Sequence, residues 1–218
     1  PIKRGVYDSA GIAFGVTLNS SGSTAYIADG SGGLKIVSLA NPSAPSLLGS
    51  TSISGIQREV VVSNGVAYLA DQMGRLVTVD VSNPSAPQQL GAVTIGRYTF
   101  NVAVDGARAL IHSADNVAYI DVIDVSNPAS PVVLTSSHSI AVDAAGGIKG
   151  IALSDGHAYV ANVGQGLKIY NVTNPLAPVF LGAGYNVGNA MDVFVDSPFV
   201  YVGDSAAVVS VTDLYSNP

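Results

Sequence analysis

Apolar residues of this chain fall into short runs that are separated by Gly, Asn, Asp, Ser or Pro. In one example, the run Glu59–Val62 leads through Ser63-Asn64-Gly65 into the run Val66–Ala70. Asn-Gly between two such runs predicts a tight β-hairpin, because both residues tolerate the positive φ that the turn requires. No segment keeps the 3.6-residue apolar period of a helix over about ten residues. The pattern therefore predicts an all-β chain.

The same order of runs and turns recurs along the chain. A first hairpin turn is expected at Ser21-Gly22, Asn64-Gly65, Asp105-Gly106, Asp155-Gly156 and Asp196-Ser197-Pro198. A second is expected at Asp29–Gly33, Gln72–Gly74, Ala114–Asn116 and Gly164–Gly166. A fourth short strand is expected at Leu47–Gly49, Gln89–Gly91, Val133–Thr135 and Phe180–Gly182. Each repeat thus predicts four antiparallel strands.

Asn-Pro pairs mark the period of these repeats. They are separated by 42, 44, 47 and 43 residues, and four of them open a longer phrase such as NPSAP. Proline lacks the N–H that a β-ladder needs, so each phrase is expected to end the third strand of its repeat. The pairs are Asn41-Pro42, Asn83-Pro84, Asn127-Pro128, Asn174-Pro175 and Asn217-Pro218.

Four strands in about 40–45 residues are typical of a blade of a β-propeller. The sequence therefore predicts one five-bladed β-propeller domain over residues 1–218. The expected repeats are residues 8–50, 51–92, 93–136, 137–183 and 184–218, the last completed by residues 1–7.

The two ends of the chain suggest how such a propeller would close. Pro1–Gly5 matches Pro45–Gly49, so the chain begins with a fourth strand, whereas its last repeat has only three strands. Residues 1–7 are expected to pair with residues 207–213, which would remove two open sheet edges. A second interpretation is that the unit belongs to a longer tandem array, and the two interpretations are compatible.

Composition narrows the possible partners. Hydrophobic residues make up 48% of the chain and charged residues 11%, and the net charge is −6. This disfavours nucleic acid, whose binding needs a concentrated basic surface. The chain has no Cys, which excludes disulfides, thiolate metal sites and cysteine nucleophiles. No apolar run is long enough to insert into a membrane, and the weakly charged surface favours an extracellular or cell-surface location.

Several phrases resemble the LVIVD-repeat family. They are Ala25–Asp29, Leu34–Val37, Val79–Pro84, Ile123–Pro128 and Tyr159–Asn162. The resemblance covers nearly the whole chain and implies a prokaryotic, secreted or surface-attached protein built from propeller-forming repeats. Its residues are core and turn residues, so it implies no catalytic residue and no cofactor. The last repeat departs from the pattern, with Val211–Tyr215 before its Asn-Pro pair.

Enzyme signatures such as HExxH, GxSxG, GxxxxGK[ST] and an EF-hand loop are absent from the sequence. Gly30–Gly33 joins two strands and precedes no helix, so it is expected to be a hairpin turn. The histidines His112, His138 and His157 fall at different places in their repeats. This spacing does not indicate a metal site, which usually needs converging ligands.

Acids recur near the second hairpin and before the Asn-Pro phrase. Asp and Asn accept backbone hydrogen bonds in turns, and a device present in almost every repeat favours that role over a binding site. Calcium binding by oxygen-rich loops is the alternative for the first group. That group is Asp29, Asp71, Asp115 and Asp204, with Asn162 in the fourth repeat, and the second is Asp80, Asp124 and Asp213, with Asn171.

Ligand binding is expected where the repeats differ, in the loops that enter the first strand of each blade. A glycan-active hydrolase would need two carboxylates about 5–10 Å apart, and Glu59 with Asp192 is the pair that the sequence offers. The candidate ligand-binding residues at the mouth of the propeller are Arg58, Glu59, Arg97, Tyr98, Asn101, Lys149, Asn189 and Asp192.

These observations favour a non-catalytic extracellular binding or assembly module. Its partners are expected to be surface glycans or other protein subunits, including further copies of itself. A larger surface protein or a homo-assembly is also expected, because low charge resists close packing only weakly and because residues 1–7 can complete a neighbouring blade. A glycan-active hydrolase remains the alternative.

Overall fold

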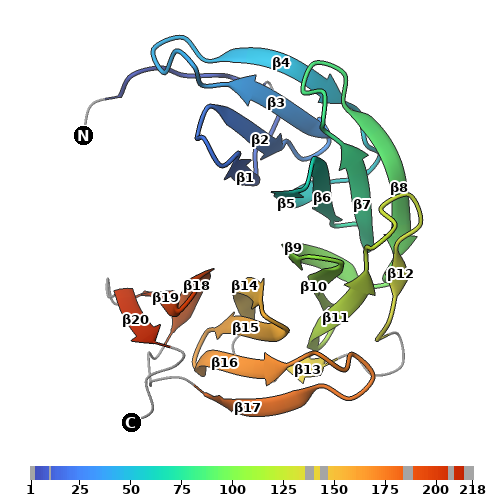
Figure 1. Ribbon diagram of the computed structural model, residues 1–218, viewed down its shortest axis with the longest axis vertical. Helices are drawn as coiled ribbons and strands as arrows, with labels where there is room; N and C mark the ends of the chain where they lie inside the picture. Colours follow the sequence, from blue (N-terminus) through green and yellow to red (C-terminus); the bar gives the residue numbers. More distant parts are fainter. Residues whose placement is uncertain are drawn as a thin grey trace. The chain divides into compact units, whose positions relative to one another are not determined.

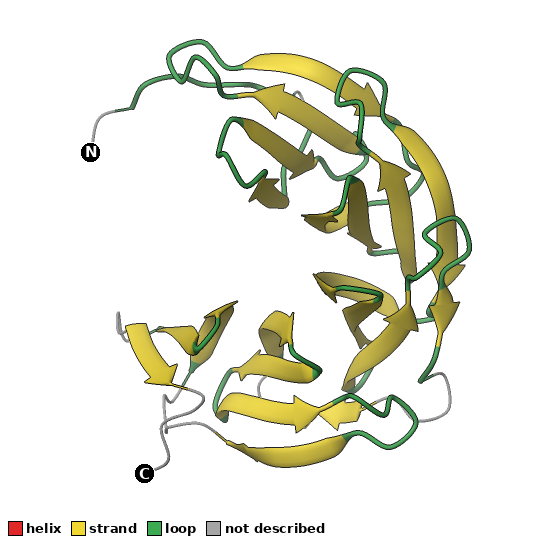
Figure 2. Ribbon diagram, viewed as in Figure 1, coloured by secondary structure: helices red, strands yellow, loops and turns green. Residues whose placement is uncertain are grey.

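The computed structural model describes residues 3–9, 11–135, 140–142, 147–183, 189–205 and 209–213. These residues form strands, turns and loops, and none of them lies in a helix (Figure 2). The all-β prediction is therefore confirmed for the described part of the chain. The chain forms two compact units, residues 1–102 with 126–131 and residues 103–125 with 132–218.

The first unit holds two complete antiparallel sheets, in which strands that follow one another in sequence lie side by side (Figure 1). The first sheet consists of β1 (Gly15–Leu18), β2 (Thr24–Ala28), β3 (Leu34–Ser38) and β4 (Ser46–Thr51). The second consists of β5 (Gln57–Ser63), β6 (Val66–Asp71), β7 (Arg75–Asp80) and β8 (Gln88–Thr94). Both sheets have the four-stranded form predicted for a blade.

Three further antiparallel sheets follow along the chain. The third consists of β9 (Tyr98–Asp105), β10 (Arg108–Ala114) and β11 (Ala118–Asp124), with β12 (Val132–Val133) and β13 (Ile140–Val142) both paired to β11. The fourth consists of β14 (Ile148–Ser154), β15 (His157–Asn162), β16 (Gly166–Asn171) and β17 (Val179–Ala183). The fifth consists of β18 (Ala190–Asp196), β19 (Phe199–Asp204) and β20 (Val209–Asp213).

The outer strand of the third sheet differs from the prediction, because it is interrupted after Val133 instead of continuing through Thr135. The Thr135 side chain takes the place of a ladder partner: its Oγ1 accepts a hydrogen bond of 2.8 Å from the N–H of Val122. Thr135 is fully buried. A polar side chain thus satisfies a backbone N–H that the interrupted strand would otherwise leave unpaired.

The predicted pairing of residues 1–7 with the last blade is absent from the described residues. Residues 3–9 adopt no strand, and the fifth sheet ends at β20. This segment packs instead against the first Asn-Pro phrase, where a Cβ built on Gly5 would lie 2.5 Å from the carbonyl oxygen of Pro42. Glycine allows that close approach because it has no Cβ.

Two of the first hairpin turns have the predicted positive φ at both central residues. Asn64 and Gly65 have φ of 50° and 77°, and Asp155 and Gly156 have φ of 50° and 72°. Positive φ at both central residues is the mark of the type I′ turn, whose twist matches that of the flanking strands. The sequence therefore predicted these hairpins for the correct physical reason.

Each described Asn-Pro phrase closes on itself by two hydrogen bonds. In Asn83–Ala86, Asn83 Oδ1 accepts from the N–H of Ser85 at 3.2 Å, and the Asn83 carbonyl accepts from the N–H of Ala86 at 3.0 Å. The same pair of bonds occurs in the phrases that begin at Asn41, Asn127 and Asn174. Proline fixes φ at the second position of such a turn, which explains why the phrase recurs almost unchanged.

Apolar side chains bury both faces of the middle strands. Between the first and second sheets, Tyr26, Leu34 and Ile36 belong to one buried cluster with Leu69 and Val77. In the second unit, one cluster joins residues of the third and fourth sheets and another joins residues of the fourth and fifth. Because a sheet covered on both faces has no polar side, the middle strands carry near-continuous apolar runs.

Candidate ligand-binding site

The first strand of the sheet begins with a β-bulge in three of the repeats. The register shifts between Gln57 and Glu59 in β5, between Ile148 and Gly150 in β14, and between Ala190 and Asp192 in β18. A bulge leaves its extra residue outside the ladder and re-aims that side chain. The residues inserted at this point are Arg58, Lys149 and Met191, and the sequence places Phe14 and Phe100 at the corresponding point of the other two repeats.

In the first unit, the side chains at these positions meet. The Cζ atom of Arg58 lies 4.2 Å from the ring centroid of Phe14 and 5.8 Å from that of Phe100. Both distances fall within the range of a cation–π interaction. Phe14 is 44% exposed, and Arg58 and Phe100 are half-buried. We call these three residues the Arg58 cluster.

The loop that leads into β9 adds a further exposed ring. Tyr98 is 58% exposed and lies two residues before Phe100 in β9. Between them, buried Thr99 fixes the strand by donating a hydrogen bond of 2.5 Å to the carbonyl oxygen of Asp71. Arg97 lies at the start of this segment, where its carbonyl oxygen is 2.7 Å from a Cβ built on Gly74.

Glu59 and Asp192, the proposed hydrolase pair, occupy equivalent positions in different repeats. Each carboxylate accepts a hydrogen bond from the next N–H of its own strand, at 3.2 Å for Glu59 and 2.9 Å for Asp192. Each also lies against a glycine of the preceding repeat, Gly15 or Gly150, where a Cβ would clash with the carboxylate. Glu59 belongs to the first unit and Asp192 to the second.

The other candidates have separate roles. Lys149 is exposed, and burial together with the charge of Lys149 lowers the pKa of His112 to about 4. Asn189 bonds local backbone: its Oδ1 accepts from the N–H of Gly164 at 3.0 Å, and its own N–H donates to Asp204 at 3.2 Å. Asn101, at the position of Glu59 in the third repeat, is half-buried.

The recurring acids near the second hairpin accept hydrogen bonds, three of them from backbone N–H groups and Asp29 from a Ser hydroxyl. Asp71 Oδ1 accepts from Ile56 and Met73, and Asp204 accepts from Asn189. Asp115 Oδ1 accepts from its own turn, and Asp29 Oδ1 accepts from the Ser9 hydroxyl at 2.6 Å. No group of three or more acidic or histidine side chains able to hold a metal ion occurs among the described residues. The hydrogen bonds shown here fit the role in turns and loops, and calcium binding stays an untested alternative.

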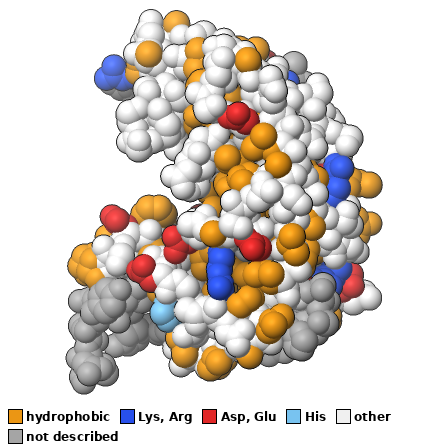
Figure 3. Space-filling view, turned by 45° about the vertical axis from the view of Figure 1, so that its right-hand side comes forward, with side chains coloured by type: hydrophobic (Ala, Val, Ile, Leu, Met, Phe, Trp, Pro, Cys, Tyr) orange, Lys and Arg blue, Asp and Glu red, His pale blue; other side chains and the backbone are white. Residues whose placement is uncertain are grey.

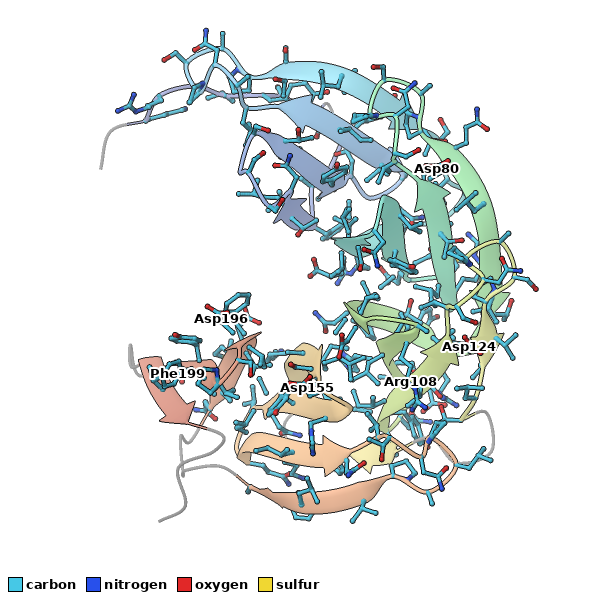
Figure 4. The ribbon with its side chains drawn as sticks, viewed as in Figure 1. Asp80, Arg108, Asp124, Asp155, Asp196 and Phe199 are labelled. Carbon is cyan, nitrogen blue, oxygen red and sulfur yellow. The ribbon has the colours of Figure 1, made fainter. Side chains whose placement is uncertain are left out.

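The acids before the Asn-Pro phrase act in the same way. Asp80 Oδ1 accepts from the N–H of Ser82 at 2.9 Å, and hydrogen bonds from the Ser82 side chain and backbone lower the pKa of this exposed carboxyl. Asn171 holds Thr173 by the equivalent bond of 2.9 Å. Asp80 and Asp124 lie where β7 and β11 end (Figure 4). The side chain of Asp213 and all of His138 lie outside the described residues.

Sequence reasoning missed two parts of this picture. Phe14 and Phe100 were not named as candidates, although aligning the repeats on the first apolar run after each entering loop would have shown their shared position with Arg58. The hydrogen bond from the Ser113 hydroxyl to the buried Asp121 carboxylate was also missed. Its signal was an Asp inside the apolar run Ile120–Ile123, where an unpaired charge would be costly.

A family model described as the LVIVD repeat matches the chain five times, over residues 10–52, 54–94, 96–138, 145–184 and 187–218. Comparison with curated proteins returned no match. Within the described residues, no helix is long and apolar enough to cross a membrane.

Solved structures of low sequence identity share the fold. Hydrazine synthase of Kuenenia stuttgartiensis is 13% identical with a TM-score of 0.69, and 92% of this chain is covered against 64% of that one. BamB from Moraxella catarrhalis is 16% identical with a TM-score of 0.61, and the match covers 95% of this chain and 60% of BamB. A chain of a nidogen–laminin complex is 13% identical with a TM-score of 0.65, at 94% and 77% coverage. The present chain thus spans less than two thirds of the first two, and the likeness supports a β-propeller type of fold.

Proposed function

The chain belongs to the LVIVD-repeat family, and from this premise we propose that it is a non-catalytic binding and assembly module that acts outside the cell or on its surface. Propeller-like neighbours such as BamB and the nidogen–laminin complex support a role in protein interactions. Few charged side chains interrupt the apolar and uncharged surface seen in Figure 3, which is compatible with close packing against other molecules.

The observation that carries this proposal is that the recurring polar residues and the variable residues lie at different positions of the repeat. The recurring acids and asparagines accept hydrogen bonds in turns and loops. The side chains that vary between repeats share one position in the repeat, at the beginning of its first strand. That point carries exposed aromatic and basic groups in the first unit. Aromatic faces with a few polar groups are typical of ligand-binding surfaces, and glycans are the ligand class that we propose.

A glycan-binding screen combined with a hydrolysis assay on the same glycans tests this function. We expect binding without turnover, and we expect Glu59→Gln to leave the glycans equally intact. Turnover that Glu59→Gln abolishes would instead support the alternative, a glycan-active hydrolase that uses Glu59 and Asp192. If no glycan binds and no protein partner is found, the proposal fails.

We also propose that residues 1–7 serve as the outer strand of a three-stranded blade, either the fifth blade of the same chain or that of a second copy. The packing of Gly5 supports this, because Gly49 of β4 and Gly91 of β8 pack on the next Asn-Pro phrase in the same way. By analogy with the register in which Gly49 pairs with Ile36, Gly5 would pair with Val211 and Val6 with Ser210.

Cysteine pairs test this strand pairing, because the chain has no Cys of its own. We expect Val6→Cys with Ser210→Cys to oxidise readily. Val6→Cys with Val211→Cys is the control, since a shift of one residue turns the side chains to opposite faces. A cross-linked monomer indicates a closed propeller and a cross-linked dimer indicates strand exchange. Equal cross-linking of both pairs would refute the register.

A further inference from the structure

The Arg58 guanidinium has no hydrogen bond or ion pair to any described residue, and its contacts are the rings of Phe14 and Phe100. Two other arginine side chains donate hydrogen bonds to acceptors within the protein. Arg75 binds the Asp71 carboxylate, and Arg108, labelled in Figure 4, donates to the Val172 carbonyl oxygen at 2.6 Å. Five N–H donors of Arg58 are therefore without a protein acceptor within the described structure.

The two rings hold this guanidinium in place without using its donors. A cation–π contact needs no hydrogen-bond acceptor, and a guanidinium that stacks on a ring keeps its N–H edge available for a ligand. Because the side chain is already ordered, less conformational entropy is lost when an anion binds. The edge of a guanidinium matches the two oxygens of a carboxylate, with which it forms two parallel hydrogen bonds.

We propose that Arg58 is the anchor for the carboxylate of an acidic sugar, such as a uronic acid, whose ring packs against the neighbouring exposed aromatic side chains. This inference rests on the proposed glycan-binding function and names its ligand class. Phe14, which lies against the guanidinium, is 44% exposed, and Tyr98, two residues before Phe100 in β9, is 58% exposed. Aromatic faces suit the C–H faces of a sugar ring.

The charge of the protein argues for a ligand with one localised negative charge. The net charge is −6, and Glu59 is the next residue along the strand. A densely charged polyanion would be repelled by this surface, whereas one carboxylate needs only one guanidinium. An acidic peptide has the same carboxylate but no ring to pack on Phe14 and Tyr98, and it is therefore a competing outcome of the test.

The probes are methyl β-glucuronide and methyl β-glucoside, which differ at the C6 carboxylate. N-acetyl-glutamate amide serves as the peptide probe. Binding to the full chain is followed by NMR titration. The variants are Arg58→Gln, Arg58→Lys and Phe14→Leu, with Arg4→Gln as the matched control, because Arg4 is exposed and its loss changes the net charge equally. Thermal unfolding of each variant shows that it remains folded.

We expect the glucuronide to bind about ten-fold or more tightly than the glucoside, as loss of a charge-assisted hydrogen-bond pair predicts. Arg58→Gln should remove that preference, Arg58→Lys should retain part of it, and Arg4→Gln should leave it unchanged. Equal binding of both sugars, or a preference that survives Arg58→Gln, would overturn the inference while the glycan-binding function stands. Binding of the glutamate probe alone, or of none of the three, would also overturn it; the glycan screen then decides the proposed function separately.

Discussion

Removal of the Asp71 carboxylate tests whether the recurring acids hold the scaffold together. Asp71 is fully buried at the end of β6. Its Oδ1 accepts hydrogen bonds from the N–H groups of Ile56 and Met73 at 3.0 and 3.1 Å, and its Oδ2 accepts from Arg75 Nε at 2.8 Å. One carboxylate thus joins the loop entering β5, the turn after β6 and the first residue of β7.

Asp71→Ala leaves two backbone donors and one guanidinium without their acceptor. A buried donor without a partner costs about 1–3 kcal/mol. Met73 is exposed and the Arg75 side chain is 28% exposed, so water can replace part of what is lost. We therefore expect a loss of about 3 kcal/mol in the free energy of unfolding. For a chain of this length, that corresponds to a fall of roughly 6–12 °C in Tm.

Two comparison variants isolate the cause. Asp71→Asn keeps an acceptor oxygen, and the fourth repeat carries Asn162 at this position, so a smaller loss of about 1 kcal/mol is expected. Asp115→Ala removes an exposed carboxylate whose Oδ1 accepts hydrogen bonds from two N–H groups of its own turn, and it should cost less than about 1 kcal/mol. A loss that is largest for Asp71→Ala and smaller for Asp71→Asn and Asp115→Ala would indicate that Asp71 acts as a buried acceptor for backbone N–H groups.

Urea denaturation followed by circular dichroism gives these free energies, and each titration is repeated with excess calcium and with a chelator. If the acids serve the backbone, calcium and chelator leave the wild-type midpoint unchanged. An Asp71→Ala variant as stable as the wild type would refute the reasoning. A wild-type midpoint that falls on chelation would favour the calcium alternative instead.

Three further predictions address other parts of the scaffold. Thr135→Val should lower the free energy of unfolding in urea by about 1–3 kcal/mol, because it leaves the buried N–H of Val122 without its acceptor, and an unchanged midpoint would contradict this. Gly49→Ala should destabilise by about 1–3 kcal/mol, since its Cβ would clash with the Pro84 carbonyl oxygen. Gly203→Ala, where no atom of a described residue lies within 4 Å of the added Cβ, is the control and should melt near the wild-type temperature. Burial, with a contribution from Lys149, lowers the pKa of His112 from 6.5 to about 4. The contribution of neutral His112 to the free energy of unfolding is therefore fully present above pH 6.5 and falls by about 3 kcal/mol as the pH drops through 4. His112→Gln should remove that step from the pH profile of unfolding.

The sequence could predict the local structure because each local device acts alone. The Asn64-Gly65 pair adopts the expected positive φ, and the Asn83-Pro84 phrase closes with bonds inside four residues. Neither needs information from distant parts of the chain. The predicted end of β12 at Thr135 was wrong for the opposite reason: the strand ends at Val133, and the Thr135 hydroxyl accepts the N–H of Val122. A side-chain acceptor of this kind gives no periodic signal.

The candidate site was predictable only in part. Arg58 was named because the entering loops differ between repeats, yet its ring partners come from two other strands. Phe14 is 44 residues before Arg58 and Phe100 is 42 residues after it, so only the repeat alignment relates them. The carboxylates of Glu59 and Asp192 each accept a hydrogen bond from the next N–H of their own strand, and their role as a hydrolase pair stays a prediction.

The bulge at the start of the first strand of a sheet explains how one scaffold can carry different ligand chemistry. The residue after next along the strand is a core residue, Val60 in β5 and Val193 in β18, and its side chain is buried. The bulged residue itself, Arg58 or Met191, lies outside the ladder register and is not fully buried. Substitution there changes what the surface presents without leaving a cavity or an unpaired backbone group. The residue that can vary with the ligand, such as Arg58, therefore lies only two residues before a residue that the core needs, such as Val60.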